Sequence, residues 1–489
     1  MYPGLHAQNT PDKPAVILAE TGAVVTYRQL EDNSAALATV LHDAGLRPGD
    51  VVAVLSDNAA PVFDVYWAAH RSGLYITAIN HHLTAAEAAY IVKDSGAKAL
   101  IVSAALGALA TEVVGQWDTR GLLLAFGGRV PGFADYDDTL AAAGPPLAEQ
   151  PCGGVMLYSS GTTGFPKGVK PPLPQRRVGE PGDASAALAS GIFGLGATDV
   201  YLSPAPIYHA APLRWCGMMQ AIGGTVVLMT KFDAEATLKY IEQYRVTAAQ
   251  MVPTMFVRLL KLDDAVRHRY DLASLRVLIH AAAPCPVDVK AAMISWLGPV
   301  VYEYYSSTEA HGMTFISSPD WLAHPGSVGR SVLGVLHICD DDGNELPTGE
   351  IGTVYFERDA LPFEYHNDTD KTSQAQHPAH PAWTTVGDLG SVDADGYLYL
   401  ADRKSFMIIS GGVNIYPQEV ENTLALHPAV HDVAVIGVPH PEMGEEVKAV
   451  VQLSAGVVET DSLAGELIDY VRARIAHFKA PRSVAFVDE

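Results

Sequence analysis

The feature that most constrains this chain is a regular alternation of apolar runs and amphipathic segments over its first hundred residues. Two of the amphipathic segments start at a capping-box spacing, with Thr26 three residues before Gln29 and Thr84 three before Glu87. Strands that alternate with helices are joined by right-handed crossovers, so the pattern predicts a mostly parallel sheet with helices on both faces. The apolar runs typical of buried strands are residues 15–19, 51–55, 75–80 and 99–103.

The alternation resumes after a loop-rich stretch that ends near Pro151, and it changes character at about residue 331. Residues 334–357 carry short strands and Gly/Asp turns, which predict an antiparallel β unit. The last ninety residues predict a small α/β domain, with a helix that starts at Pro417 and a second after Thr460 whose apolar face runs to Ile475.

Composition excludes several classes of protein. Lys and Arg number 32 and Asp and Glu 55, giving a formal net charge of −23, which argues against a nucleic-acid binder or a basic membrane-surface protein. No apolar run approaches the length of a membrane span, and the N-terminus has no signal-peptide pattern. Four scattered cysteines without a CxxC pair indicate reduced thiols and a cytoplasmic location. The 48% of hydrophobic residues is ample for a globular core.

The sharpest local signal is the stretch YSSGTTGFPKG, residues 158–168. Glycines let backbone N–H groups approach a ligand, hydroxyls donate hydrogen bonds and a lysine adds a point charge, so the stretch suits phosphate binding. A flexible surface loop is the simpler alternative. A Walker A loop is excluded by spacing, because Pro166 precedes Lys167 and Gly168 follows it.

At this stretch the chain resembles the adenylate-forming superfamily, in its acyl-CoA ligase branch, and further stretches match in the same order along nearly the whole chain. The resemblance implies that Thr162, Thr163, Gly164 and Lys167 hold the pyrophosphate of ATP. It also implies a large N-terminal domain of mostly parallel α/β layers plus a β unit, residues 1–401, and a small mobile C-terminal α+β domain, residues 402–489.

The stretch YYSSTE, residues 304–309, is similar to the family's aromatic-x-x-Thr-Glu stretch. Tyr305 would offer a flat face to adenine, Thr308 a hydroxyl to the α-phosphate and Glu309 a hard oxygen to Mg²⁺. The resemblance also implies that Asp388 takes the two ribose hydroxyls and that Arg403 contacts the ribose.

Other residues are assigned by the same resemblance. Lys404 or Ser405 would be the hinge of the C-terminal domain, whose rotation would separate the two half-reactions. Gly411 and Gly412 would line the pantetheine tunnel, where a Cβ would intrude. His209 would lie near the acyl pocket, although a lone histidine is more often structural. Residues 280–284 (HAAAP) resemble the segment that lines the acyl and adenine pocket.

The implied activity is that of an ATP-dependent, AMP-forming acid–thiol ligase with ATP, Mg²⁺ and CoA. An acyl-AMP ligase that loads a carrier protein and a degenerate acyl-adenylate- or CoA-binding protein stay open as alternatives. The next acidic residues after His209 are Asp233 and Glu235 at a predicted helix start, which disfavours an amino-acid substrate. Trp215, Met218 and Met219 could line an apolar pocket or belong to the core; the first option favours a fatty or alicyclic acid.

One departure from the family concerns the C-terminus. The family's adenylation lysine follows a strand like residues 483–489, and the chain ends at Glu489, so no lysine here takes that role. We therefore expect an incomplete C-terminal domain and weak adenylation. The partners expected are a carboxylic acid, ATP and CoA, without nucleic acid or a transmembrane segment; the sequence leaves open whether the chain forms a homodimer.

Overall fold

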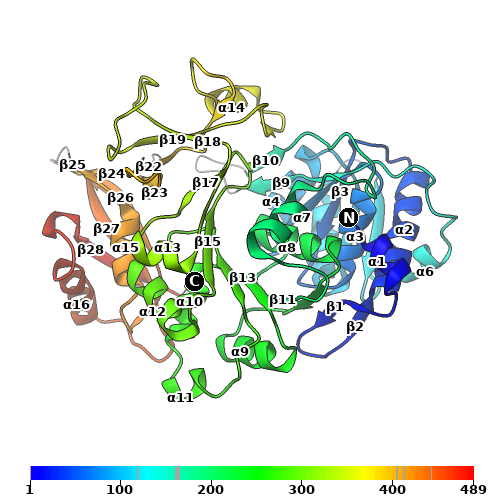
Figure 1. The fold of residues 1–489 in the computed structure, drawn as a ribbon, viewed down its shortest axis with the longest axis horizontal. Coiled ribbons are helices and arrows are strands. Elements are labelled where there is room, and N and C mark those ends of the chain that lie inside the picture. The colour runs from blue at the N-terminus through cyan, green and yellow to red at the C-terminus, as the bar shows by residue number, and fades with distance from the viewer. Residues whose placement is uncertain are drawn as a thin grey trace.

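The computed structural model describes residues 2–117, 121–159, 166–403, 406–410, 413–441 and 443–488. Its central sheet carries the parallel strands in the order β15-β14-β13-β11-β12-β1, with antiparallel strands at both edges (Figure 1). The parallel strands are β1 (Pro14–Leu18), β11 (Val200–Ser203), β12 (Thr225–Leu228), β13 (Ala248–Met251), β14 (Val277–His280) and β15 (Val301–Tyr305). The edge strands are β2 (Val24–Thr26), β16 (Met313–Ile316) and β17 (Arg330–Leu333).

A second sheet, in the order β7-β6-β5-β3-β4-β8, pairs in parallel throughout its described length. The parallel α/β prediction for the N-terminal part is therefore confirmed. The strands are β3 (Val51–Leu55), β4 (Tyr75–Ile79), β5 (Ala97–Ser103), β6 (Leu122–Phe126), β7 (Ala134–Asp135) and β8 (Gly154–Val155).

Helices cover the parallel sheets, and both predicted capping boxes are present, at α2 (Tyr27–Asp43) and α4 (Ala85–Asp94). Trp215 and Met219 of α8 (Ala210–Ala221) are buried in the main core, and Met218 packs against it. Core packing therefore explains these side chains. The other helices of this part are α1 (Pro3–Asn9), α3 (Pro61–His70), α5 (Gly107–Gly115), α6 (Tyr136–Ala141), α7 (Ala184–Phe193), α9 (Ala234–Gln243), α10 (Pro253–Leu260), α11 (Asp264–Arg267), α12 (Val287–Leu297) and α13 (Ser318–Ala323).

The antiparallel β unit predicted after residue 331 is confirmed. Its strands are β18 (Val335–Cys339), β19 (Gly352–Glu357), β21 (Trp383–Thr384), β22 (Asp388–Val392) and β23 (Leu398–Arg403). A small antiparallel sheet joins segments distant in sequence, namely β9 (Leu157–Ser159), β10 (Lys167–Lys170) and β20 (Glu364–Tyr365), which α14 (Thr369–Gln374) follows.

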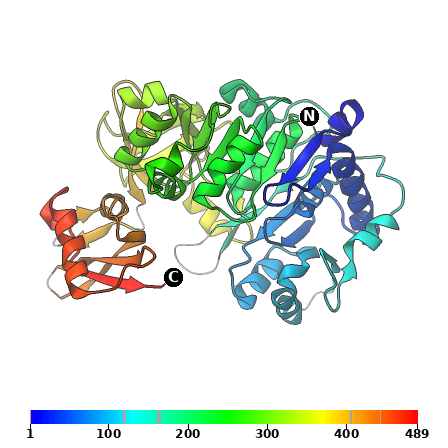
Figure 2. The same ribbon diagram turned by 90° about the horizontal axis from the view of Figure 1, so that it is seen from below.

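The C-terminal domain lies at one end of the molecule, drawn in orange and red in Figure 2. Its strands are β24 (Ile408–Ser410), β25 (Val413–Ile415), β26 (Val430–His440), β27 (Gly444–Leu453) and β28 (Ser483–Val487), packed against α15 (Pro417–Leu424) and α16 (Asp461–Arg472). The helix predicted after Thr460 ends before Ile475, which still packs against this core from the following turn. Across the part of the chain that the structure describes, no helix has both the length and the apolar content to cross a bilayer.

Candidate active site

The candidate site lies at the carboxyl ends of β14 and β15, where ligands of open parallel sheets commonly bind. The loop after each strand contains an alanine at positive φ, Ala282 at 77° and Ala310 at 51°. Such a conformation costs a non-glycine residue on the order of 1–3 kcal/mol and is concentrated at functional sites. A third residue of this kind, Asn367 at φ 58°, follows β20, which contacts the same region.

Tyr305 and Asp388 meet across two sheets. The Tyr305 hydroxyl donates a hydrogen bond to Oδ2 of Asp388 at 2.6 Å. Asp388 is buried as the first residue of β22, and its register partner on β23 is Arg403. The end of β15 and the β22–β23 hairpin therefore bring an aromatic ring and a carboxylate together, with the backbone of Arg403 beside the carboxylate.

Glu309 and Lys167 both lie close to Tyr365, a residue that the sequence reasoning missed. The Tyr365 hydroxyl donates to Oε1 of the buried Glu309 at 2.8 Å. Nζ of Lys167 is 6.0 Å from the centre of the Tyr365 ring and 3.8 Å from a carboxylate oxygen of Asp368. The pairing of β10 with β20 creates this arrangement, so no local pattern in the sequence could have indicated it.

Helix α8 connects Thr308 with the region of His209. Arg214 of α8 donates to the backbone oxygen of Thr308 at 3.2 Å. His209 is the N-cap residue of α8, and partial desolvation lowers the pKa of its imidazole. The helix that His209 caps is therefore hydrogen-bonded to the 305–309 segment within its first turns.

Several histidines near these residues were also missed. His311 is fully buried, its Nδ1 is 2.8 Å from the Ser307 hydroxyl, and burial lowers its pKa to about 4. Its ring meets the Tyr305 ring edge-on at 6.1 Å, so a neutral imidazole supports the ring predicted to face adenine. At the start of α8, the Tyr208 ring lies 4.4 Å from His209 and 5.3 Å from His81.

The structure thus joins Tyr305 directly to Asp388 and connects Lys167 with Glu309 through Tyr365, while Tyr305, Thr308 and Glu309 share the segment that ends β15 and follows it. Seven predicted residues lie outside the described part of the chain. These are Thr162, Thr163 and Gly164 of the phosphate loop, the hinge residues Lys404 and Ser405, and the tunnel glycine Gly411 with its neighbour Gly412. Of the segment 280–284, His280 is buried in the core, whereas Ala282, Ala283 and Pro284 are exposed.

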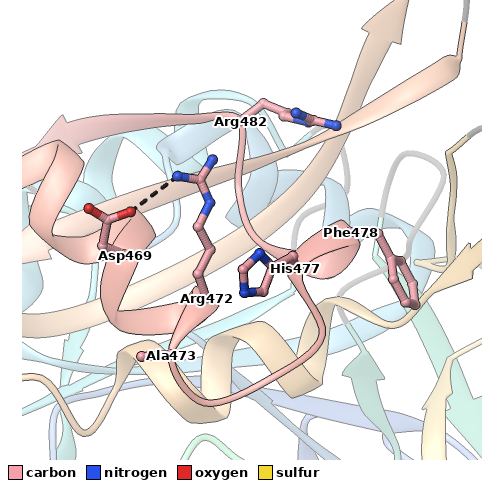
Figure 3. A pocket seen from close by; sticks show the side chains of 6 residues that line it. All are labelled: Asp469, Arg472, Ala473, His477, Phe478 and Arg482. Atoms are coloured by element: carbon pink, nitrogen blue, oxygen red, sulfur yellow. Dashed lines mark hydrogen bonds and ion pairs between the residues drawn. The ribbon is translucent and has the colours of Figure 1, made fainter.

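A surface pocket of about 590 Å³ lies on the C-terminal domain (Figure 3). Arg472, which pairs with Asp469 at 3.1 Å, and Arg482 line it together with His477 and Phe478, a residue that is 52% exposed. Two guanidinium groups and an open aromatic ring suit a ligand that carries phosphate and a base. The sequence reasoning did not identify this pocket.

The donor set at Glu309 fits a magnesium ion bound together with substrate phosphates. Oε1 accepts the Tyr365 hydrogen, and the other carboxylate oxygen makes no hydrogen bond within the described residues. Across the same residues there is no cluster of three or more His, Cys, Asp or Glu side chains that could form a protein-only cage. Mg²⁺ is usually held by one or two carboxylates plus phosphate oxygens. The single buried carboxylate of Glu309 fits this coordination.

Comparison with known proteins identifies the family of the chain. The family model for the AMP-binding enzyme matches residues 5–365, and that for the AMP-binding enzyme C-terminal domain matches residues 419–489. The chain therefore belongs to the AMP-binding enzyme family, whose fold it has, and its class is that of the AMP-forming acid–thiol ligases that use ATP, Mg²⁺ and CoA.

Individual relatives cover almost the whole chain. Feruloyl-CoA synthase from Amycolatopsis sp is 33% identical, over 100% of this chain and 94% of the relative. The fatty acid–[acyl-carrier-protein] ligase ScoC from Streptomyces coeruleorubidus is 30% identical, over 99% and 91%. The structure of o-succinylbenzoate CoA synthetase from Bacillus subtilis with its acyl-adenylate intermediate superposes with a TM-score of 0.81 at 26% identity, covering 100% of this chain and 94% of that one.

Proposed function

We propose that this chain joins a carboxylic acid to CoA in two steps. In the first, a carboxylate oxygen attacks the α-phosphorus of ATP, the bond to the β-phosphate oxygen breaks, and acyl-adenylate and pyrophosphate form. In the second, the CoA thiolate attacks the acyl carbonyl, AMP leaves, and the thiol proton passes to solvent. The observation that carries the proposal is the convergence of Tyr305 and Asp388 with Glu309, Tyr365 and Lys167.

Each residue has a role that its surroundings support. Tyr305 would stack on adenine, and Asp388, held by the Tyr305 hydroxyl, would accept from the ribose hydroxyls. Arg403, opposite Asp388, would contact the same ribose. Lys167, with Thr162, Thr163 and Gly164, would stabilise pyrophosphate, and Thr308 the α-phosphate. Glu309 would hold Mg²⁺, which neutralises charge on the phosphates when bound.

The remaining assignments concern the acyl group and the mobile domain. His209, at the start of α8, would lie beside the acyl carbonyl. Gly411 and Gly412 would line the pantetheine path, and Lys404 or Ser405 would act as the hinge. The domain boundary would lie close to the predicted residue 402, just after Arg403, because β23 ends at Arg403 within the preceding unit and β24 pairs within the C-terminal one.

The pocket on the C-terminal domain favours CoA as the acceptor. CoA carries a nucleotide with phosphates, which Arg472 and Arg482 could bind while Phe478 contacts the base. A phosphopantetheinyl carrier protein is the second candidate, because the relative ScoC is named as a ligase that uses one. The acceptor is decided by offering both to the enzyme in one assay.

The acid is less constrained than the acceptor. Burial of Trp215 and Met219 removes the main sequence argument for a fatty or alicyclic acid, and the relatives named above act on chemically different acids. A hydrophobic acid and a cytoplasmic location stay predictions, and the oligomeric state stays open.

The test starts the reaction at two points, from ATP and a free acid and from a ready-made acyl-adenylate. The full chain is incubated with ATP, Mg²⁺, CoA and a panel of carboxylic acids, and separately with synthetic acyl-adenylates and CoA. We expect AMP and an acyl-CoA thioester, identified by mass spectrometry, and a kcat/KM that ranks the acids. Absence of thioester from both starting points, across the panel, would show that the chain is not a ligase.

A further inference from the structure

A buried ion pair lies directly behind the loop that follows β14. Nζ of Lys290 donates to Oε2 of Glu303 at 2.5 Å, and the two residues are 0% and 5% exposed. The same carboxylate oxygen lies 3.5 Å from Nε2 of His280, which is fully buried. Nothing in the two chemical steps above uses these three groups.

The pair is surrounded by apolar rings, so burying its two charges costs free energy of folding. The Trp321 ring lies 5.0 Å from Nζ of Lys290, and the Phe256 ring lies 5.2 Å from the His280 ring. Removing two charges from water costs several kcal/mol per ion in real proteins, and well-packed apolar replacements are often as stable or more stable. A gain in stability therefore does not explain the pair. A hydrogen bond has a preferred direction, so the pair can fix the position of the segments that it joins.

The segments next to the pair flank the loop of residues 281–286. His280 immediately precedes this loop and is the register partner of Glu303, while Lys290 lies in the first turns of α12, which follows the loop. Both ends of the loop therefore converge on one carboxylate. The loop contains Ala282 at φ 77°, a strained conformation that the flanking structure must hold in place.

The same carboxylate is linked to the nucleotide residues. Glu303 stands two residues before Tyr305 on β15, and alternate residues of a strand project from one face. Any shift of Glu303 along or across the strand therefore moves the Tyr305 ring relative to the loop.

We propose that Glu303, held by Lys290 and flanked by His280, is a positioning residue that sets the 281–286 loop against Tyr305 and so shapes the nucleotide site. The proposal rests on the nucleotide-binding role of Tyr305 in the proposed function. Apolar replacement would preserve packing but would allow α12 and the loop to slide, because dispersion contacts fix no direction.

The test replaces the pair by apolar residues of similar volume, Lys290→Met/Glu303→Leu, in the full chain. A matched control, Arg71→Met/Glu31→Leu, removes a 2.6 Å ion pair of a buried arginine between α2 and α3, away from the site. AMP affinity is measured by calorimetry and the unfolding midpoint by differential scanning fluorimetry. A third variant, Glu303→Gln, keeps an acceptor for Lys290 without the charge.

We expect both double variants to unfold within about 5 °C of the wild type. The Kd for AMP should rise at least about tenfold in Lys290→Met/Glu303→Leu, since small misplacements of binding groups are costly. It should rise less in Glu303→Gln and stay within about twofold in the control. Wild-type affinity in the site double variant, or in Glu303→Gln if the double variant does not fold, overturns the positioning role. A wild-type chain that does not bind AMP refutes the proposed function instead, and the positioning role falls with it.

Discussion

The role of Asp388 can be isolated by changing the protein and the ligand together. Asp388→Asn keeps the shape and one acceptor oxygen but removes the charge, and 2′,3′-dideoxy-AMP removes the two hydroxyls that the carboxylate is proposed to accept from. Asp388 is 7% exposed and already receives the Tyr305 hydroxyl at 2.6 Å. Each hydrogen bond to a charged group contributes about 1.5–3 kcal/mol.

Taking the lower end of that range, the wild type should bind dideoxy-AMP more weakly than AMP by about 3 kcal/mol, or roughly a hundredfold in Kd. Neutral hydrogen bonds are roughly half as strong, so Asp388→Asn should lose only about 1.5 kcal/mol on the same change of ligand. The coupling energy is then about 1.5 kcal/mol, well above the error of a double-mutant cycle.

Four titrations by isothermal calorimetry complete the cycle. Asp395→Asn serves as the matched control, because Asp395 lies exposed in the next turn of the same hairpin. It should leave the dideoxy penalty at its wild-type size. Equal penalties in the wild type and Asp388→Asn would refute the contact between Asp388 and the ribose, whatever the absolute affinities.

Three further predictions follow from single residues. Glu309→Gln should raise the Mg²⁺ concentration needed for half-maximal ATP binding by about tenfold, because an amide is a poorer ligand for a hard cation yet still accepts from Tyr365; an unchanged Mg²⁺ dependence contradicts the assignment. Phe478→Ala should raise the KM for CoA by about fivefold or more when thioester forms from synthetic acyl-adenylate, with kcat unchanged; a constant KM removes the pocket from CoA binding. Burial raises the pKa of Asp64 to about 8. Between pH 4 and pH 8 the folded chain therefore keeps a proton that the unfolded chain has released. Because of this difference, the free energy of unfolding of the wild type falls relative to that of Asp64→Asn as the pH rises towards 8. The variant should be more stable by up to about 4 kcal/mol at pH 7 and nearly equal at pH 4; a urea-midpoint difference that does not grow with pH would show that Asp64 is ionised in the folded state.

Local features of the chain were predictable because their causes are local. The capping boxes at Thr26 and Thr84 act over three residues, and the start of a helix at Pro417 depends on the geometry of one residue. Strand runs such as residues 51–55 are apolar throughout because both faces of a parallel sheet are covered.

Contacts that join distant segments were not predictable in the same way. Tyr365 reaches Glu309 only because β20 pairs with β10, and nothing near either residue indicates that partnership. From the sequence, Trp215 and Met219 could line an acyl pocket or belong to the core, and their burial places them in the core. The Lys290–Glu303 pair was invisible for the same reason, since a charged residue in a helix or strand is usually solvated.

Residue order alone therefore carries the α/β class, the order of the functional stretches and the chemistry that each stretch can perform. These depend on propensity, spacing and the donors and acceptors that a short segment offers. The folded arrangement adds which of those groups meet: Asp388 at the Tyr305 hydroxyl, Tyr365 near both Glu309 and Lys167, and Glu303 bonded to Lys290 beyond one end of a strained loop and close to His280 at the other. Such meetings depend on sheet order and register across hundreds of residues, and a hydrogen bond forms only when two groups come within about 3 Å of each other.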